Sequence, residues 1–190
     1  MLLWRAPFPE TWLEKVRENL GAVLIDHAHL ERKAATSALN LEKYVELHDR
    51  VDELNAIAIE ELQHFGMVLG LLRERGIGFG PPVRSAWISG LMKAVRKGRR
   101  HQVIDHLIAC ALIEGRSCEK FQVLAENTAD LDEALARFYA GLVESEGNHY
   151  ATYLLMARHI DEGETASRLD FFLDLDAELI SAPNPLPILH

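Results

Sequence analysis

Apolar residues recur every three or four positions over four long stretches of the chain, which is the spacing of helices that bury one face. The four stripes run Leu13, Val16, Leu20, Leu24, Ala28, Ala35 and Ala38; Leu54, Ile57, Phe65, Val68 and Leu72; Ile104, Leu107, Ala111, Cys118, Phe121 and Ala125; and Leu135, Phe138, Leu142, Tyr153, Met156 and Ile160. Each stripe predicts one helix of about 25 to 30 residues, with little strand signal in between. We therefore expect an all-α protein built on a four-helix bundle.

The segments between the stripes predict how the four helices are joined. The glycines and prolines of 76–82 end the second helix, and the link from there to about Arg99 is the longest connection in the chain. The first and second helices meet near His48, and the third and fourth meet near 127–130. Two hairpins joined by a long crossover at 77–100 are similar to the ferritin-like bundles.

The C-terminal part of the chain predicts one more helix and a tail. A shorter apolar stripe at about 165–180 indicates a fifth helix that packs on the outside of the bundle. The tail at 181–190 contains three prolines, so we expect an extended strap. Nothing in the pattern marks a second domain.

Each of the four long stripes is interrupted by a carboxylate, and two are interrupted again by a histidine three residues later. The interrupting residues are Glu31, Glu61, His64, Glu114, Glu146 and His149. They keep the spacing of their apolar neighbours, so we expect them to point inward. A single inward Glu or His is usually structural, but here each hairpin supplies one Glu from its first helix and a Glu-x-x-His from its second.

The joint arrangement points to metal chemistry. Four carboxylates buried as ions in one apolar core would each cost several kcal/mol. Two divalent cations would cancel the four charges, and neutral imidazoles would complete the coordination. Four Glu and two His with open positions predict a di-iron or di-manganese site, and ligand type alone leaves the choice of metal open.

The stretches around these residues resemble the tRNA hydroxylase family of the ferritin-like di-iron carboxylate superfamily. The stretches are Leu30–Ala35, Glu60–Phe65, Ile113–Phe121 and Glu144–Tyr150. Enzymes of that family hydroxylate the isopentenyl side chain of 2-methylthio-N6-isopentenyladenosine in tRNA. The resemblance implies one ferritin-like di-iron domain over 1–190, with two iron ions and O2 as cosubstrate. By the same resemblance one iron would be held by Glu31, Glu61 and His64 and the other by Glu114, Glu146 and His149, with Glu61 and Glu146 bridging.

Two further expectations follow from the hydroxylase resemblance. Residues within a turn or two of the ligands are substrate-pocket candidates, although core packing is the commoner role: Ala35, Phe65, Ser117, Cys118, Phe121 and Tyr150. The chain has no flavin or iron–sulfur motif, so the electrons must come from an external donor, a reductase or a ferredoxin.

The charge distribution changes the picture that the overall composition gives. With 20 Lys and Arg against 29 Asp and Glu, the net charge is −9, which suits nucleic acid poorly if it is spread evenly. However, 75–104 contains seven basic residues and no acidic one, so the crossover is a basic patch. We expect it to contact the anticodon loop of tRNA through Arg84, Trp87, Lys93, Arg96, Lys97, Arg99 and Arg100, with Trp87 stacking on an unpaired base.

Other functions remain open from the sequence alone. The crossover could be a solvated linker, and the protein could be a ferritin-like or rubrerythrin-like iron-oxidising or peroxidase protein with no nucleic-acid substrate. The first 15 residues lack an apolar signal core, and the longest apolar run, Leu107 to Ile113, is too short to cross a bilayer. We therefore expect a cytoplasmic protein with no membrane partner.

Overall fold

The computed structural model describes residues 4–183, 186 and 188–190, and over those residues it is helical with no strand. In chain order the elements are α1 (Thr11–Glu18), α2 (Leu20–Leu41), the 3₁₀ helix η1 (Val45–Arg50), α3 (Val51–Glu74), α4 (Ala86–Lys93), α5 (Arg99–Asn127), α6 (Glu133–Ile160) and α7 (Glu162–Ser181). None of these helices is long and apolar enough to cross a membrane.

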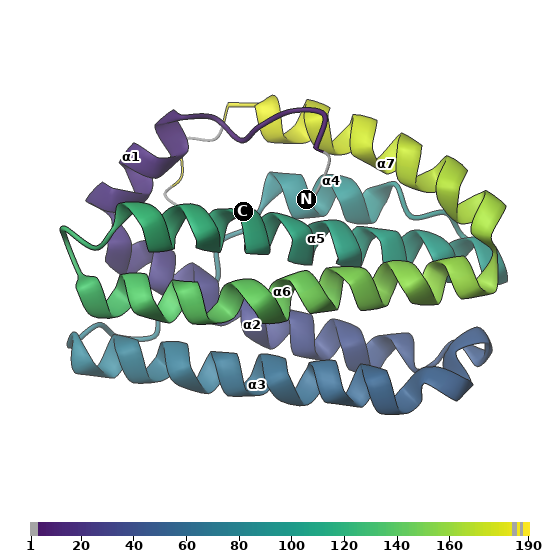
Figure 1. Ribbon diagram of the computed structural model, residues 1–190, viewed down its shortest axis with the longest axis horizontal. Coiled ribbons are helices and arrows are strands. Elements are labelled where there is room, and N and C mark those ends of the chain that lie inside the picture. The colour runs from purple at the N-terminus through teal and green to yellow at the C-terminus, as the bar shows by residue number, and fades with distance from the viewer. Residues whose placement is uncertain (1–3, 184–185, 187) are drawn as a thin grey trace.

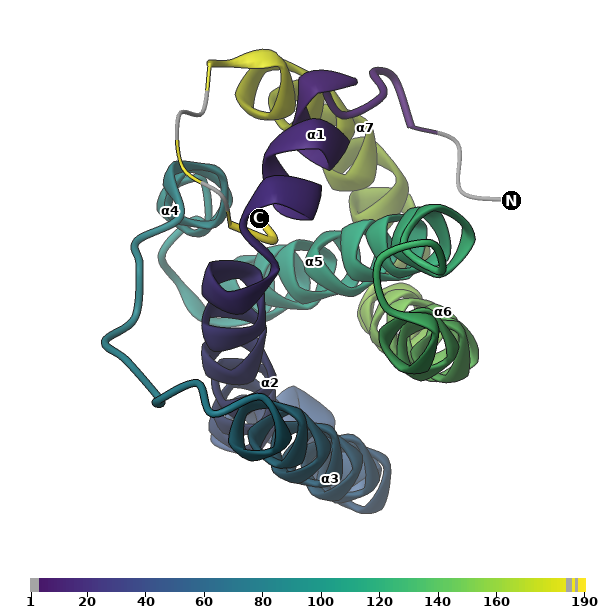
Figure 2. The same ribbon diagram turned by 90° about the vertical axis from the view of Figure 1, so that its left-hand side faces the viewer.

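Four of the helices form the predicted bundle. α2 and α3 pack as one pair, connected through η1, and α5 and α6 pack as the other, connected by a short turn (Figure 1). Figure 2 shows the two pairs nearly end-on, with α1, α4 and α7 outside them. The ferritin-like four-helix bundle, its long crossover and its extra C-terminal helix are therefore confirmed.

The first predicted helix is wrong in its length, because two helices replace it. Asn19 leaves the helical region with φ −134° and ψ 36°, and its side-chain amide donates to the Lys15 carbonyl at 2.9 Å. This local bond competes with a continuous helix, as is common for Asn. α2 and α3 are also shorter than expected, at 22 and 24 residues, whereas α5 and α6 have 29 and 28.

The crossover contains a short helix, α4, that the sequence pattern did not predict. The Ser85 side chain caps this helix by accepting a hydrogen bond from the Ile88 amide at 3.0 Å. α4 packs against α5 and α7, and Gly90 makes the second contact possible, because a Cβ there would lie 2.5 Å from a Leu179 methyl carbon. An eight-residue helix gives too few turns for its apolar periodicity to stand out.

The described end of the tail returns into the molecule. Residues 184, 185 and 187 lie outside the described part, but Ile188, Leu189 and His190 are all buried. The Leu189 amide donates to Asp26 at 2.8 Å, and the indole of Trp12 donates to the Ile188 carbonyl at 3.1 Å. We call residues 188–190 the C-terminal plug, since they fill the space between α1, α2 and α5.

Buried ion pairs attach the outer helices to the bundle. Arg116 of α5 pairs with Asp176 of α7, and both side chains are fully buried. Asp176 also accepts a hydrogen bond from the indole of Trp87 in α4 at 3.0 Å. One buried carboxylate therefore connects three helices, and it holds α4 and α7 in fixed positions beside α5.

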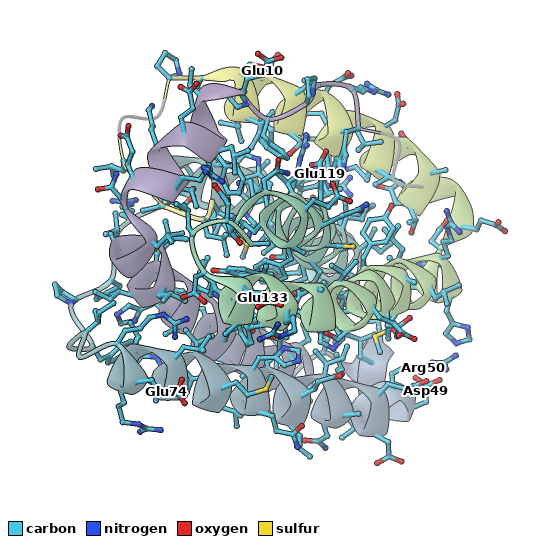
Figure 3. The ribbon with its side chains drawn as sticks, turned by 60° about the vertical axis from the view of Figure 1, so that its left-hand side comes forward. Glu10, Asp49, Arg50, Glu74, Glu119 and Glu133 are labelled. Carbon is cyan, nitrogen blue, oxygen red and sulfur yellow. The ribbon has the colours of Figure 1, made fainter. Side chains whose placement is uncertain are left out.

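The metal-site candidates lie deep within the bundle rather than at its ends. In Figure 3, Asp49 and Arg50 mark the start of α3, and Glu74 marks its opposite end. Glu61 and His64 lie near the middle of that helix and are buried. Ten residues of α3, about three turns, therefore lie on either side of this pair and shield it from solvent.

Candidate metal centre

The six interrupting residues of the sequence converge at the centre of the bundle. Each of the four bundle helices contributes a carboxylate, and α3 and α6 each add a histidine; all six side chains belong to residues that are 5% exposed or less. Their donor atoms fall into two overlapping groups, within each of which all lie within 4.8 Å of one another. The groups are Glu31, Glu61, His64 and Glu146, and Glu61, Glu114, Glu146 and His149.

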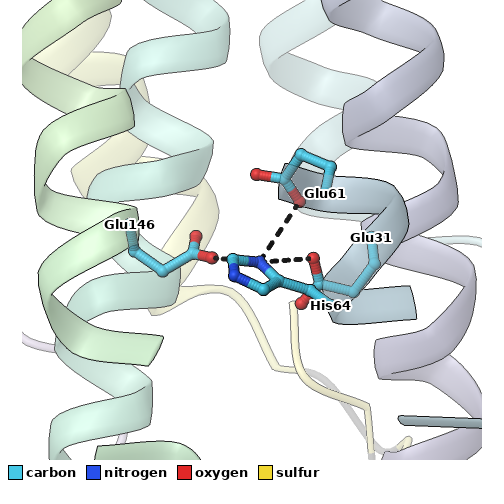
Figure 4. A group of neighbouring side chains, drawn as sticks. All are labelled: Glu31, Glu61, His64 and Glu146. Carbon is cyan, nitrogen blue, oxygen red and sulfur yellow. Dashed lines mark ion pairs between the residues drawn. The ribbon is translucent and has the colours of Figure 1, made fainter. Parts of the chain in front are cut away.

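The first group is arranged around His64 (Figure 4). The Nδ1 atom of His64 lies 3.6 Å from Glu31, 3.8 Å from Glu146 and 4.0 Å from Glu61, measured to a carboxylate oxygen in each case. Glu146 reaches this point from the opposite side of the bundle. Separations of this size leave room for a cation between the donors rather than direct hydrogen bonds.

The second group is organised around His149. Its Nδ1 lies 2.7 Å from Glu61 Oε1, although the two atoms are not aligned for a hydrogen bond. Its Nε2 lies 2.9 Å from a carboxylate oxygen of Glu60, which faces away from the cluster. A carboxylate on the outer nitrogen of a metal-binding histidine fixes the ring so that the inner nitrogen faces the metal.

Four donor atoms of the cluster have no hydrogen-bond partner, as expected if they bind a metal ion. Glu61 Oε1, His64 Nδ1, Glu146 Oε1 and His149 Nδ1 are buried and unpaired among the described residues. Burying an unpaired polar atom costs about 1–3 kcal/mol, so four in one place require a common partner. Carboxylate oxygens with two imidazole nitrogens suit a pair of divalent iron or manganese ions.

The carboxylates perturb one another strongly. Burial, together with the charge of Glu31, raises the pKa of Glu114 to about 7. Burial and the charge of Glu114 also raise the pKa of Glu61 and of Glu146 well above the usual range. Without cations, the cluster would therefore hold protons at neutral pH.

Glu31 departs from this pattern because His27 contacts it. Burial raises the pKa of Glu31, but the charge and hydrogen bond of His27 outweigh burial and lower that pKa below its usual range. His27 is fully buried, and its ring packs against Phe121 and Tyr139 at centroid distances of 4.8 and 5.6 Å. The sequence interpretation missed His27, although its position four residues before Glu31 places it on the same helix face.

A cavity of about 440 Å³ reaches the cluster from one side. Of the predicted pocket residues, Ser117 and Phe121 line it. Within the described chain, its lining does not include Ala35, Phe65, Cys118 or Tyr150. The cavity lies between α2 and α5 on the side of α4. Its lining includes three further neighbours of the ligand candidates, His27, Leu30 and Ile113, and three residues that only the fold brings there, Ile88, Met92 and His190.

The predicted tRNA contacts of the crossover divide into buried, paired and exposed residues. Trp87 is only 5% exposed and stacks on His190 at 5.2 Å, so it belongs to the core and has no open face for a base. Arg96 pairs with Asp105 and Glu164, and Arg100 pairs with Asp161. The remaining candidates are exposed: Arg84, Lys93, Lys97 and Arg99.

The family model of tRNA-(MS2IO6A)-hydroxylase (MiaE) matches residues 2–190. The chain belongs to this hydroxylase family. It is 38% identical over 180 residues to the tRNA 2-(methylsulfanyl)-N(6)-isopentenyladenosine(37) hydroxylase of Pseudomonas putida strain KT2440, a match that covers 94% of this chain and 86% of the relative. It is 30% identical to the hydroxylase of the same name from Salmonella typhimurium strain LT2, over 94% of this chain and 83% of that one.

A solved structure agrees with this membership of the hydroxylase family. The "Protein 43 with aldehyde deformylating oxygenase activity from Synechococcus" superposes with a TM-score of 0.93 at 29% identity, covering 100% of this chain and 96% of the other. The resemblance expected from the sequence is therefore confirmed for both the family and the fold.

Proposed function

We propose that this hydroxylase uses two iron ions to insert an oxygen atom from O2 into the isopentenyl side chain of 2-methylthio-N6-isopentenyladenosine in tRNA. The observation that carries the proposal is the pair of overlapping buried donor groups that share Glu61 and Glu146. The printed names of the family and of its relatives support the substrate. The open cavity beside the donors gives that side chain a place to bind.

Each iron would be held by its own carboxylate and histidine and by the two shared carboxylates. Glu31 and His64 would hold one ion, Glu114 and His149 would hold the other, and Glu61 and Glu146, which belong to both donor groups, would serve both. When bound, the irons supply the activation of O2. One oxygen atom enters the new alcohol and the other leaves as water, so each turnover takes two electrons and two protons from an external reductase or ferredoxin.

The residues of this chain would position the substrate and keep the site dry. Leu30, Ile113 and Phe121 give the cavity apolar walls that fit the branched, apolar isopentenyl group. Ser117 is held by a 2.9 Å hydrogen bond with His190, which fixes the polar part of the wall. The pocket therefore orients one end of the substrate at the carboxylates and excludes water from them.

The test combines metal content with product analysis. Protein purified from iron-supplemented cells should contain about two irons per chain. With a reductase, 18O2 and prenylated tRNA, it should yield a nucleoside that carries one labelled oxygen. Glu114→Ala should lose at least half of the iron and nearly all activity, whereas Glu126→Ala, an exposed change on the same helix, should keep both. No bound metal after anaerobic reconstitution with Fe²⁺ would overturn the proposal.

A further inference from the structure

The cavity beside the metal-site candidates reaches the surface between α2 and α4. Its inner end is formed by buried carboxylates such as Glu31, and its outer residues are exposed. On the α2 side the rim carries Arg32, Lys33 and Thr36, and on the α4 side it carries Ile88 and Met92. We call this opening the α2–α4 mouth.

The chain on both sides of the mouth lacks exposed negative charge. Between Ala28 and Leu41 the only carboxylate is the buried Glu31, and 75–104 has none. The protein as a whole carries a net charge of −9, so the surface around the mouth differs sharply from the average surface. A surface region without exposed carboxylate side chains favours the binding of an anionic partner.

The cations around the mouth are also available, unlike those at the end of the crossover. The described part of the structure places no carboxylate in ion-pair contact with Lys33 or Lys93, and both side chains are exposed. By contrast, Arg96 and Arg100 are paired with carboxylates. They also flank the start of α5, about 22 Å along that helix from Glu114.

We propose that the phosphates of a tRNA anticodon loop bind across the α2–α4 mouth, with Arg32 and Lys33 on one side of the entrance and Lys93, which follows Met92 at the end of α4, on the other. The prenyl group would then enter over Met92 while the phosphates stay outside. An unpaired base is needed for this geometry, and a loop supplies one at low cost. The inference rests on the proposed function and moves the tRNA contact from the end of the crossover to the mouth.

The test is the affinity of the purified protein for a prenylated anticodon stem-loop RNA, measured at several salt concentrations. Charge reversal of Arg32 and Lys33 to Glu should raise Kd at least tenfold and reduce the slope of log Kd against log salt by about 1 to 2. Reversal of Arg73 and Arg158, two exposed residues elsewhere, makes the same charge change and should shift Kd by less than about threefold.

A change on the other side of the mouth is needed because variants next to Glu31 can lose metal. Lys93→Glu lies outside the helices that carry the ligand candidates, and it should also weaken binding and lower the salt slope by about 1. Wild-type affinity in both mouth variants, or a larger loss on reversal of Lys97 and Arg99, would overturn the inference. Failure of the wild type itself to bind or hydroxylate the RNA would instead overturn the proposed function.

Discussion

His64 and His149 hold equivalent places in the two hairpins, yet their surroundings differ. His149 has Glu60 on its outer nitrogen at 2.9 Å. The residue that corresponds to Glu60 in the other hairpin is Ser145, and its hydroxyl donates instead to the Leu142 carbonyl at 2.9 Å. Among the described residues, the outer nitrogen of His64 has no such carboxylate, so the two metal positions are chemically unequal.

Replacement of Glu60 should weaken metal binding at the His149 position. We expect Glu60→Ala to lower the affinity of one of the two sites about 10- to 100-fold, because the imidazole loses its orienting partner. Glu60 is 46% exposed, so the free energy of unfolding of the metal-free protein should change by less than about 0.5 kcal/mol. Anaerobic calorimetric titration with Mn²⁺ or Fe²⁺ measures both sites.

The matched control for this residue is Ser145→Ala. It removes a polar group at the corresponding place in the other hairpin, and both metal affinities should stay near the wild-type values. Equal affinities in Glu60→Ala and the wild type would show that Glu60 does not orient His149.

The sequence predicted the convergence of six side chains but not the residues that support them. The ligand candidates could be recognised in the sequence because each one interrupts an apolar stripe. Glu60 lies on the exposed edge of its helix and breaks no pattern. His190 is far from the site along the chain and meets Ser117 only through the path of the tail. Contacts of that kind depend on tertiary structure and leave no local signal.

At the level of elements, the C-terminal plug closes one side of the bundle. Lys120 of α5 donates a hydrogen bond to the Leu189 carbonyl. Burial and, to a smaller extent, the charge of Arg116 lower the pKa of Lys120 to about 7. His190 stacks on Trp87 of α4. The plug therefore connects α4 and α5 and forms part of the cavity wall.

Truncation of Leu189 in the C-terminal plug should destabilise the folded protein. Leu189 is fully buried, and we expect Leu189→Ala to lower the free energy of unfolding by about 2–5 kcal/mol through lost burial and the cavity left behind. Leu155→Ala, at a leucine that is 62% exposed on α6, should change it by less than about 0.5 kcal/mol. Urea denaturation of the wild type and the two variants measures these changes. A similar small loss of unfolding free energy in both variants would mean that the plug is not docked in solution.

The elements themselves were predictable in proportion to their length. α5 and α6 have several turns each, so their apolar stripes are clear. The break at Asn19 was missed because the apolar spacing continues across it while the backbone changes direction. α4 was missed because its packing partner, Leu179 of α7, is brought to it by the fold.

At the level of the whole molecule, the candidate metal site joins the two hairpins. Glu61 comes from the first hairpin and Glu146 from the second, and both belong to each donor group. Without cations, these groups are buried and unpaired, which opposes the close approach of the hairpins. Metal binding and the stability of the complete bundle should therefore be linked.

We expect metal to stabilise the protein against unfolding. Free Mn²⁺ or anaerobic Fe²⁺ at about 100 times Kd should add about 2.7 kcal/mol for each site, seen as a higher Tm. Glu146→Gln should be at least as stable as the wild type without metal, because the buried amide is neutral without taking up a proton. It should gain much less on metal addition. Equal stabilisation of the wild type and Glu146→Gln by metal would show that the metal binds at a site that does not include Glu146.

One side of the entrance to the cavity comes from a part of the chain that contributes nothing to its reactive end. All six ligand candidates lie on the bundle helices, whereas α4 supplies one side of the mouth and none of the candidates. Substitutions in α4 would therefore change which molecules reach the carboxylates without moving the helices that hold them. During evolution, such a protein could acquire a new substrate through its crossover while it inherits the same oxidation chemistry.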